Sequence, residues 1–214
     1  MRKICIIFCA IGVCSGANAY SLFNFEEFTA TSGQVIGNTG GYTSLTETDS
    51  GISMSVNRSS GAKFDVVDID SFTSINFPLT WDHRALSPFF ASSTNDWFVG
   101  NFSTTLRAIE LEMTDFSADS DTVTMEVYSG ANATGSLLAT VTNFWGFQSG
   151  PSYAAVGWAS NTQTAQSIRF RGGGSSFPQS MFVDNIAVRA AVPEPATMAA
   201  LGLGVAALLR RRKK

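Results

Sequence analysis

Apolar and polar residues alternate along the interior of this chain with the two-residue period of a β-strand. In the clearest run, residues 106–116, the segment from Ile109 to Thr114 has the sequence IELEMT. Residues 123–128 (VTMEVY) continue the alternation, and the small and acidic residues 117–121 between the two runs favour a turn. Because such alternation buries one face of a strand, we expect the two runs to form a β-hairpin.

Shorter runs of the same character fill the rest of the interior, and no stretch there has the period of an amphipathic helix. Segments rich in Gly, Ser, Asn and Thr separate these runs. Short strands joined in this way are typical of antiparallel sandwiches, and the 17 phenylalanines suit two facing inner surfaces. We therefore predict an all-β fold, an antiparallel jelly-roll-like β-sandwich, with further strands at residues 21–25, 52–58, 64–69, 97–102, 136–141, 154–159, 167–171 and 181–188.

The C-terminal end of the sequence has three parts in a fixed order. Pro193, Glu194 and Pro195 precede an apolar run of 14 residues, 196–209. As a helix this run would rise about 21 Å, which is short for a bilayer core of about 30 Å. A basic stop follows, whose long side chains would hold the end of the run on the cytoplasmic side: Arg210, Arg211, Arg212, Lys213 and Lys214.

This three-part pattern resembles the PEP-CTERM sorting signal of Gram-negative bacteria. The resemblance implies a short transmembrane helix, transient residence in the inner membrane and cleavage near the Pro-Glu-Pro sequence by an exosortase-type membrane protease. Two alternatives are an ordinary C-terminal membrane anchor and a buried core helix. A permanent membrane span is usually longer than this run, and a group of five cations is not suited to a core.

The N-terminal end has the order of features of a secretory signal peptide. A positive n-region, an apolar h-region and a small-x-small cleavage site before Tyr20 are formed by Arg2 and Lys3, residues 4–13, and Ala17 with Ala19. We therefore predict three segments: a signal peptide at residues 1–19, a β-sandwich ectodomain at residues 20–190 and a sorting signal at residues 191–214.

The three cysteines, Cys5, Cys9 and Cys14, all lie in the predicted signal peptide. Lipoprotein processing at Cys14 is an alternative, but the bulky Val13 before it argues against that route. The mature protein would contain no thiol, which excludes disulfides, thiolate catalysis and zinc–thiolate sites. Residues 20–193 retain seven cations and sixteen acids, a formal charge of −9, which argues against nucleic acid as a partner.

The interior carries a second, looser resemblance, to jelly-roll domains found among PEP-CTERM proteins and carbohydrate-binding modules. It rests on Phe25 and Glu26, on residues 182–188 (FVDNIAV), and on a hairpin-like stretch at residues 123–138. The resemblance implies a structural calcium ion held by Glu26 and Asp184, and calcium takes carboxylate oxygens readily. The alternative is an exposed Glu26 and an Asp184 that caps a turn.

Sugar binding needs exposed aromatic platforms, and the candidates are Trp81, Trp97 and Trp145. The alternative is that these rings cover the ends of the core. Hydrolysis has less support, because the sequence has no nucleophile-elbow, zinc-protease or P-loop motif. Its one histidine, His83, is expected in a surface loop, and adjacent strand residues point to opposite faces, so Asp82 would not orient it.

The sequence therefore predicts an exported cell-surface or exopolysaccharide-matrix protein, processed by an exosortase-type protease, whose ectodomain is structural or adhesive and not an enzyme. Two alternatives remain for the ectodomain. One is a carbohydrate-binding module that acts on secreted polysaccharide. The other is a jelly-roll enzyme that degrades polysaccharide, and the small number of basic residues argues against it.

Overall fold

The computed structural model describes residues 20–32, 41–72, 77–88, 96–115, 121–145, 153–174 and 181–191. The predicted signal peptide, with Ala17 and Ala19, and the predicted tail helix with its Pro-Glu-Pro sequence and basic stop lie outside these residues. No helix in the described part of the chain is long and apolar enough to cross a membrane.

The regular elements among the described residues are strands, apart from one short 3-10 helix. In chain order the elements are β1 (Tyr20–Phe23), β2 (Thr31–Ser32), β3 (Ser44–Asp49), β4 (Ile52–Arg58), β5 (Asp65–Asp68), η1 (Ile69–Ser71), β6 (Arg84–Ser87), β7 (Phe98–Asp115), β8 (Asp121–Tyr128), β9 (Leu137–Trp145), β10 (Ala154–Ala159), β11 (Ala165–Gly173) and β12 (Met181–Ala190).

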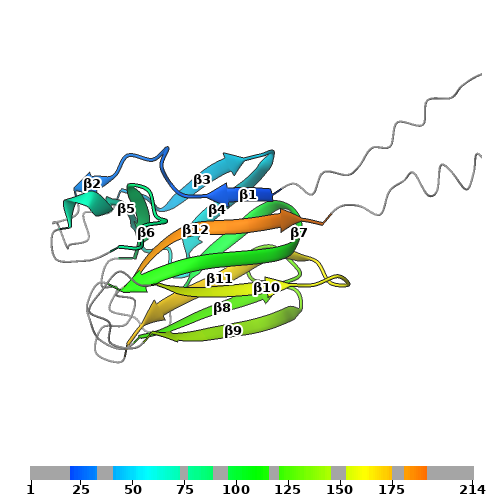
Figure 1. Cartoon of the computed structure of the whole chain (residues 1–214). Helices are drawn as coiled ribbons and strands as arrows, with labels where there is room; N and C mark the ends of the chain where they lie inside the picture. Colours follow the sequence, from blue (N-terminus) through cyan, green and yellow to red (C-terminus); the bar gives the residue numbers. More distant parts are fainter. Residues whose placement is uncertain are drawn as a thin grey trace, which may run out of the picture. The chain divides into compact units, whose positions relative to one another are not determined.

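The 18-residue strand β7 belongs to two layers (Figure 1). Its first part, residues 98–102, pairs with β4 and β11, and this layer continues through β8 to β9 and through β4 to β3. Its second part, residues 106–115, pairs with β10 and β12. Strands β1 and β6 pair with the other edge of β12, and β5 and β2 extend the sheet beyond β6. All of these pairings are antiparallel except the two-residue contact between β2 and β5.

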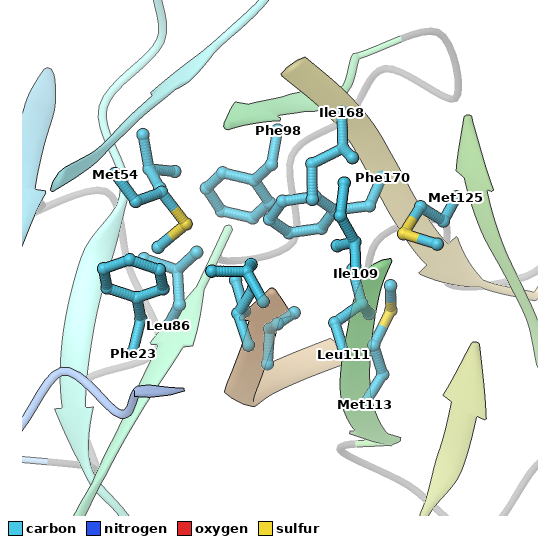
Figure 2. Close-up of a cluster of buried hydrophobic side chains, with 14 of the residues drawn as sticks. Phe23, Met54, Leu86, Phe98, Ile109, Leu111, Met113, Met125, Ile168 and Phe170 are labelled. Carbon is cyan, nitrogen blue, oxygen red and sulfur yellow. The ribbon is translucent and has the colours of Figure 1, made fainter. Parts of the chain in front are cut away.

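The main hydrophobic core lies between the two layers, because alternate residues of their strands are buried there. In β4 the buried positions are 52, 54, 56 and 58, and in β8 they include 121, 123, 125 and 127. Figure 2 shows side chains from both layers meeting in this core, among them Met54, Phe98, Met125, Ile168 and Phe170 from one layer and Phe23, Leu86, Ile109, Leu111 and Met113 from the other.

The predicted all-β, antiparallel, sandwich-like fold is confirmed by these pairings. The predicted hairpin between residues 106–116 and 123–128 is wrong, since β7 pairs with β4, β10, β11 and β12, and β8 pairs with β9 and β11. Alternation identifies the buried face of a strand but not its partner, and here the chain passes from one layer to the other between the two runs. The hairpin-like stretch at residues 123–138 does pair, as β8 with β9.

Gly135 lies in the connection between β8 and β9, and its backbone has a conformation that other residues adopt only with strain. This residue has φ of 76°, and a Cβ added there would lie 2.7 Å from Ser129 Oγ. We expect Gly135→Ala to lower the free energy of unfolding by about 1–3 kcal/mol, measured by urea denaturation. Gly41→Ala is the matched control, because a Cβ at Gly41 meets nothing within 4 Å. Equal stability of the two variants would contradict the prediction.

Candidate functional sites

A cluster of acidic side chains, Glu26, Asp82, Glu112 and Asp184, lies where the segment before β6 packs against β12 and β7. Hydrogen bonds from neighbouring groups hold it together, and one of them runs from Asn185 Nδ2 to Glu112 Oε2 at 3.0 Å. Trp81 Nε1 donates to Glu112 Oε2 at 2.8 Å, the His83 amide donates to Glu26 Oε1 at 2.6 Å, and Asn24 Nδ2 donates to Asp82 Oδ2 at 3.1 Å. We call these four carboxylates the acidic cluster.

The position of Asp184 follows from local features of β12. Phe182 and Asp184 are two residues apart and so lie on the same face of the strand. Phe182 is in a second, smaller hydrophobic cluster with Val67, Ile69, Trp81 and Ala85. This cluster covers that face of β12, and Asp184 is therefore fully buried. A register shift follows Asp184, and Asn185 has φ of 51°.

Asp184 is electrostatically unusual. Neither of its carboxylate oxygens has a hydrogen-bond partner. The pKa of Asp184 is raised from 3.8 to about 8, chiefly by burial and in addition by the charges of Glu26, Asp82 and Glu112, while the nearby Asn185 amide opposes these effects. A buried carboxylate without partners is uncommon in folded proteins and stays neutral or acquires a cation. The Asp184 carboxylate is therefore the strongest candidate in this region for a side chain that binds a cation.

The residues fit a hard cation chemically, because the cluster offers only oxygen donors and one of them is buried without a partner. Glu26 lies in the turn that follows β1, close enough to Asp184 to affect its pKa. Within the described residues no three acidic, histidine or cysteine side chains already form a metal-binding group. Backbone carbonyls and water would have to complete the ligand set, as they commonly do for calcium. The calcium ion therefore remains a prediction.

His83 is on the surface and pairs with Asp70, not with Asp82. His83 Nδ1 lies 2.6 Å from Asp70 Oδ2, and the two side chains are 66% and 65% exposed. The hydrogen bond to Asp70 and the charge of Asp70 raise the pKa of His83. The predicted surface position agrees with this geometry, whereas the pairing with Asp70 was not visible in the sequence.

Trp81 and Trp97 do not form the exposed platforms that sugar binding would need. Trp81 is 6% exposed and Trp97 is 8% exposed, so this role is excluded for both rings by burial. Trp97 packs against two guanidinium groups, with the Arg169 Cζ 4.5 Å and the Arg171 Cζ 4.2 Å from the ring centroid. The Trp145 side chain lies outside the described atoms, although its backbone pairs with Asp121 in the sheet.

A groove with a volume of about 430 Å³ lies on the outer surface of the layer that contains β1, β12, β7 and β10. Figure 1 shows these four strands side by side. We define the outer groove by six of the residues that line it: Tyr20, Ala108, Glu110, Gly157, Ala187 and Arg189. No motif in the sequence indicates this groove. The available signal was small residues at outward positions of neighbouring strands.

The last strand connects the described domain to the C-terminal end. β12 ends at Ala190, and the Ala191 amide donates to Thr105 O at 2.8 Å. The chain is therefore hydrogen-bonded to the domain as far as Ala191. Residues 191–213 match the family model described as the PEP-CTERM protein-sorting motif. The chain carries a PEP-CTERM sorting motif. The resemblance inferred from the sequence is therefore confirmed for this segment.

Comparison with other proteins adds little to the PEP-CTERM match. No curated protein matches the chain. Among solved structures, the family 11 carbohydrate-binding module from Clostridium thermocellum, in complex with a β-1,3-1,4-mixed-linked tetrasaccharide, is similar at 12% identity and a TM-score of 0.31. That alignment covers 83% of this chain and 99% of the module. The likeness is too weak to assign a ligand.

Proposed function

We propose that this protein is exported, held briefly in the inner membrane by its tail and cut near Pro-Glu-Pro by an exosortase-type protease. The mature domain then serves at the cell surface or in the exopolysaccharide matrix as a structural or adhesive protein without enzymatic activity. The PEP-CTERM motif at residues 191–213 carries this proposal. A side-chain charge of −9 over residues 20–193 is compatible with solubility outside the cell.

The geometry of the first and last strands supports processing at both ends. Tyr20, the first residue after the proposed signal cleavage, pairs with Arg189, and β1 pairs with β12 over its whole length. Cleavage before Tyr20 and beyond Ala191 would therefore leave every one of these backbone pairs in place. The domain can lose both signals without losing part of its sheet.

Replacing Pro193, Glu194 and Pro195 by alanines tests the proposal. We expect the wild-type protein, isolated from the native envelope and medium, to begin at Tyr20 and to lack the apolar run. The variant should begin at Tyr20 but keep residues 196–214, since its recognition sequence is gone. Intact-mass measurement distinguishes the two forms, and any added mass on the new C-terminus identifies what the domain is attached to.

Exchange of Arg212 for lysine and of Lys213 and Lys214 for arginine is the matched control for the tail, because it keeps both the Pro-Glu-Pro sequence and the charge of the basic stop, and this variant should be processed as the wild type is. Retention of residues 196–214 by the wild-type protein would show that the tail is a permanent anchor and would overturn the proposal.

We further propose that a structural calcium ion binds at the acidic cluster through Glu26 and Asp184. The support is the buried Asp184 carboxylate, which has no hydrogen-bond partner and lies among three other acids. A divalent cation would neutralise Asp184 and join the turn after β1 to β12. Its role would be stability, because the ion would lie beneath packed side chains.

The alternative function, a carbohydrate-binding domain, is favoured by one observation. The outer groove combines an exposed aromatic ring, that of Tyr20, with one exposed acid and one exposed base. Ligand sites of this size commonly combine apolar surface with a few polar groups. Binding of secreted polysaccharide by the mature domain would make the protein an adhesive of the matrix.

A further inference from the structure

The outer groove owes its shape to small residues on three neighbouring strands. Ala187 of β12 pairs with Glu110 of β7, which pairs with Gly157 of β10, and these positions form a row across the sheet. In the next row, Tyr20, Arg189, Ala108 and Ala159 follow one another in register across four strands. The small residues in these rows, Ala187, Gly157, Ala108 and Ala159, leave a hollow beside Glu110 and Arg189, and Tyr20 forms a wall at the β1 side.

The groups in this hollow suit a ligand with both an apolar face and hydroxyl groups. Tyr20 is 60% exposed, so its ring is available for packing. Glu110 and Arg189 are also exposed and line the groove from adjacent strands. One accepts hydrogen bonds and the other donates them, and their charges cancel. A polyanion would in addition be repelled by the charge of −9 on residues 20–193.

We propose that the outer groove binds an uncharged saccharide segment of extracellular polysaccharide. The Tyr20 ring packs against the face of a sugar ring, Arg189 donates hydrogen bonds to hydroxyl oxygens, and Glu110 accepts hydrogen bonds from hydroxyl groups. This inference rests on the proposed export to the matrix, where such a ligand is present. It gives the proposed adhesive function a ligand class and a binding site.

The site also depends on maturation of the chain. Tyr20 is the residue that follows the predicted signal cleavage site, so removal of the signal peptide places a free α-amino group at the wall of the groove. That amino group would add a hydrogen-bond donor beside Tyr20. Full binding is therefore expected only from chains that begin at residue 20.

Gly157→Val separates binding from folding. A Cβ at Gly157 would lie 3.7 Å from Glu110 Cγ, an ordinary van der Waals contact, and the backbone there is not in the left-handed region. The valine side chain fills the hollow, and a β-branched residue suits a strand better than glycine. We expect an unchanged or higher melting temperature together with at least about tenfold weaker saccharide binding, as steric exclusion from a site requires.

Tyr20→Ala tests the ring itself. We expect about tenfold weaker binding from the loss of ring stacking. Tyr153→Ala is the matched control, because Tyr153 is also exposed, at 45%. It lies just before the first residue of β10, whereas the groove is at the other end of that strand. This control should bind as the wild type does.

The experiment uses processed protein purified from the native envelope or medium, with intact mass recorded for each variant. Affinity electrophoresis and titration calorimetry compare a soluble neutral β-glucan, the producing cell's own extracellular polysaccharide and polygalacturonate. Binding of a neutral polymer or of the cell's own polysaccharide that is lost in Gly157→Val and Tyr20→Ala supports the proposal. Equal binding by Gly157→Val, a preference for polygalacturonate, or no binding to any of the three polymers overturns it. The masses report tail removal separately, so failure of the groove and failure of the sorting proposal are distinguishable.

Discussion

Arg58→Met is expected to lower the free energy of unfolding by about 3–5 kcal/mol, because it leaves the Asp96 carboxylate buried without its counter-charge. Arg58 and Asp96 form an ion pair in which the side chains are 1% and 2% exposed. Arg58 Nη1 also donates to Pro88 O at 3.0 Å. The pair therefore joins the end of β4 to residues on either side of the segment 89–95.

The surroundings of Asp96 explain why its charge persists without solvent. Burial alone would raise the pKa of Asp96, but hydrogen bonds from Ser60 and Ser59 and the charge of Arg58 bring it below the usual value. The Ser60 hydroxyl donates at 2.7 Å and the Ser59 hydroxyl at 2.8 Å. A methionine at position 58 fills a similar volume but supplies neither a charge nor a hydrogen-bond donor. The loss of stability therefore comes from the buried Asp96 carboxylate, which no longer has its counter-charge.

Urea denaturation at neutral pH measures the effect. Arg189→Met is a suitable control, since that arginine is exposed and its loss should change the free energy of unfolding by less than about 0.5 kcal/mol. A double variant, Arg58→Met with Asp96→Asn, should recover part of the loss because the uncompensated charge is gone. A loss below about 1 kcal/mol in the single variant would show that the pair contributes little.

This ion pair illustrates what alternation in the sequence could and could not predict. The predicted strand at residues 52–58 is confirmed, and its period places Arg58 on the same face as Ile52, Met54 and Val56. The partner is 38 residues away and becomes a neighbour only because β4 and β7 pair in a register that places Arg58 opposite Phe98. No local pattern encodes that register.

The same limitation explains the wrong hairpin. Residues 97–102 and 106–116 looked like two strands, whereas the structure has one strand, β7, that passes from one layer to the other. Strand β3 was not predicted, because only Leu45 and Glu47 of its six residues are buried and the second of these is an acid. Partners and layers depend on contacts between distant segments, which composition and period do not specify.

The candidate sites follow the same division. The sorting motif is a continuous sequence and was predicted from the sequence alone. The outer groove, by contrast, is made by residues of four strands spread from Tyr20 to Arg189. Small residues carry no chemical signal by themselves, and two of the tryptophans that did carry one, Trp81 and Trp97, are buried.

Without calcium, the wild-type protein is expected to lose stability as the pH rises from about 4 to about 8. The pKa of Asp184 is 3.8 in its ordinary state and about 8 in the fold. Between these values the folded state holds one more proton than the unfolded state, so the free energy of unfolding falls with rising pH. The loss from this group amounts to about 5 kcal/mol by pH 8.

Asp184→Asn should remove this dependence, because the amide has the same shape and does not ionise. Glu47 contributes a second decline, since burial raises its pKa from 4.5 to about 7. The difference between wild type and Asp184→Asn cancels that contribution. Urea denaturation between pH 4 and pH 8 in the presence of EDTA is therefore expected to show the variant as the more stable protein at the upper end of the range.

Calcium should reverse this order. A bound divalent ion stabilises the charged form of Asp184, and stability then increases with the concentration of free ion, since the ion binds the folded state and not the unfolded one. At pH 8 calcium should stabilise the wild-type protein and leave Asp184→Asn unchanged. Glu26→Gln should weaken the response. Equal stabilisation of wild type and Asp184→Asn by calcium would exclude Asp184 as a metal ligand. Parallel pH profiles of the two proteins in EDTA would show that the fold does not raise the pKa of Asp184. Because the two measurements use the same variant, they separate an acid that is kept neutral by burial from one that is kept charged by an ion.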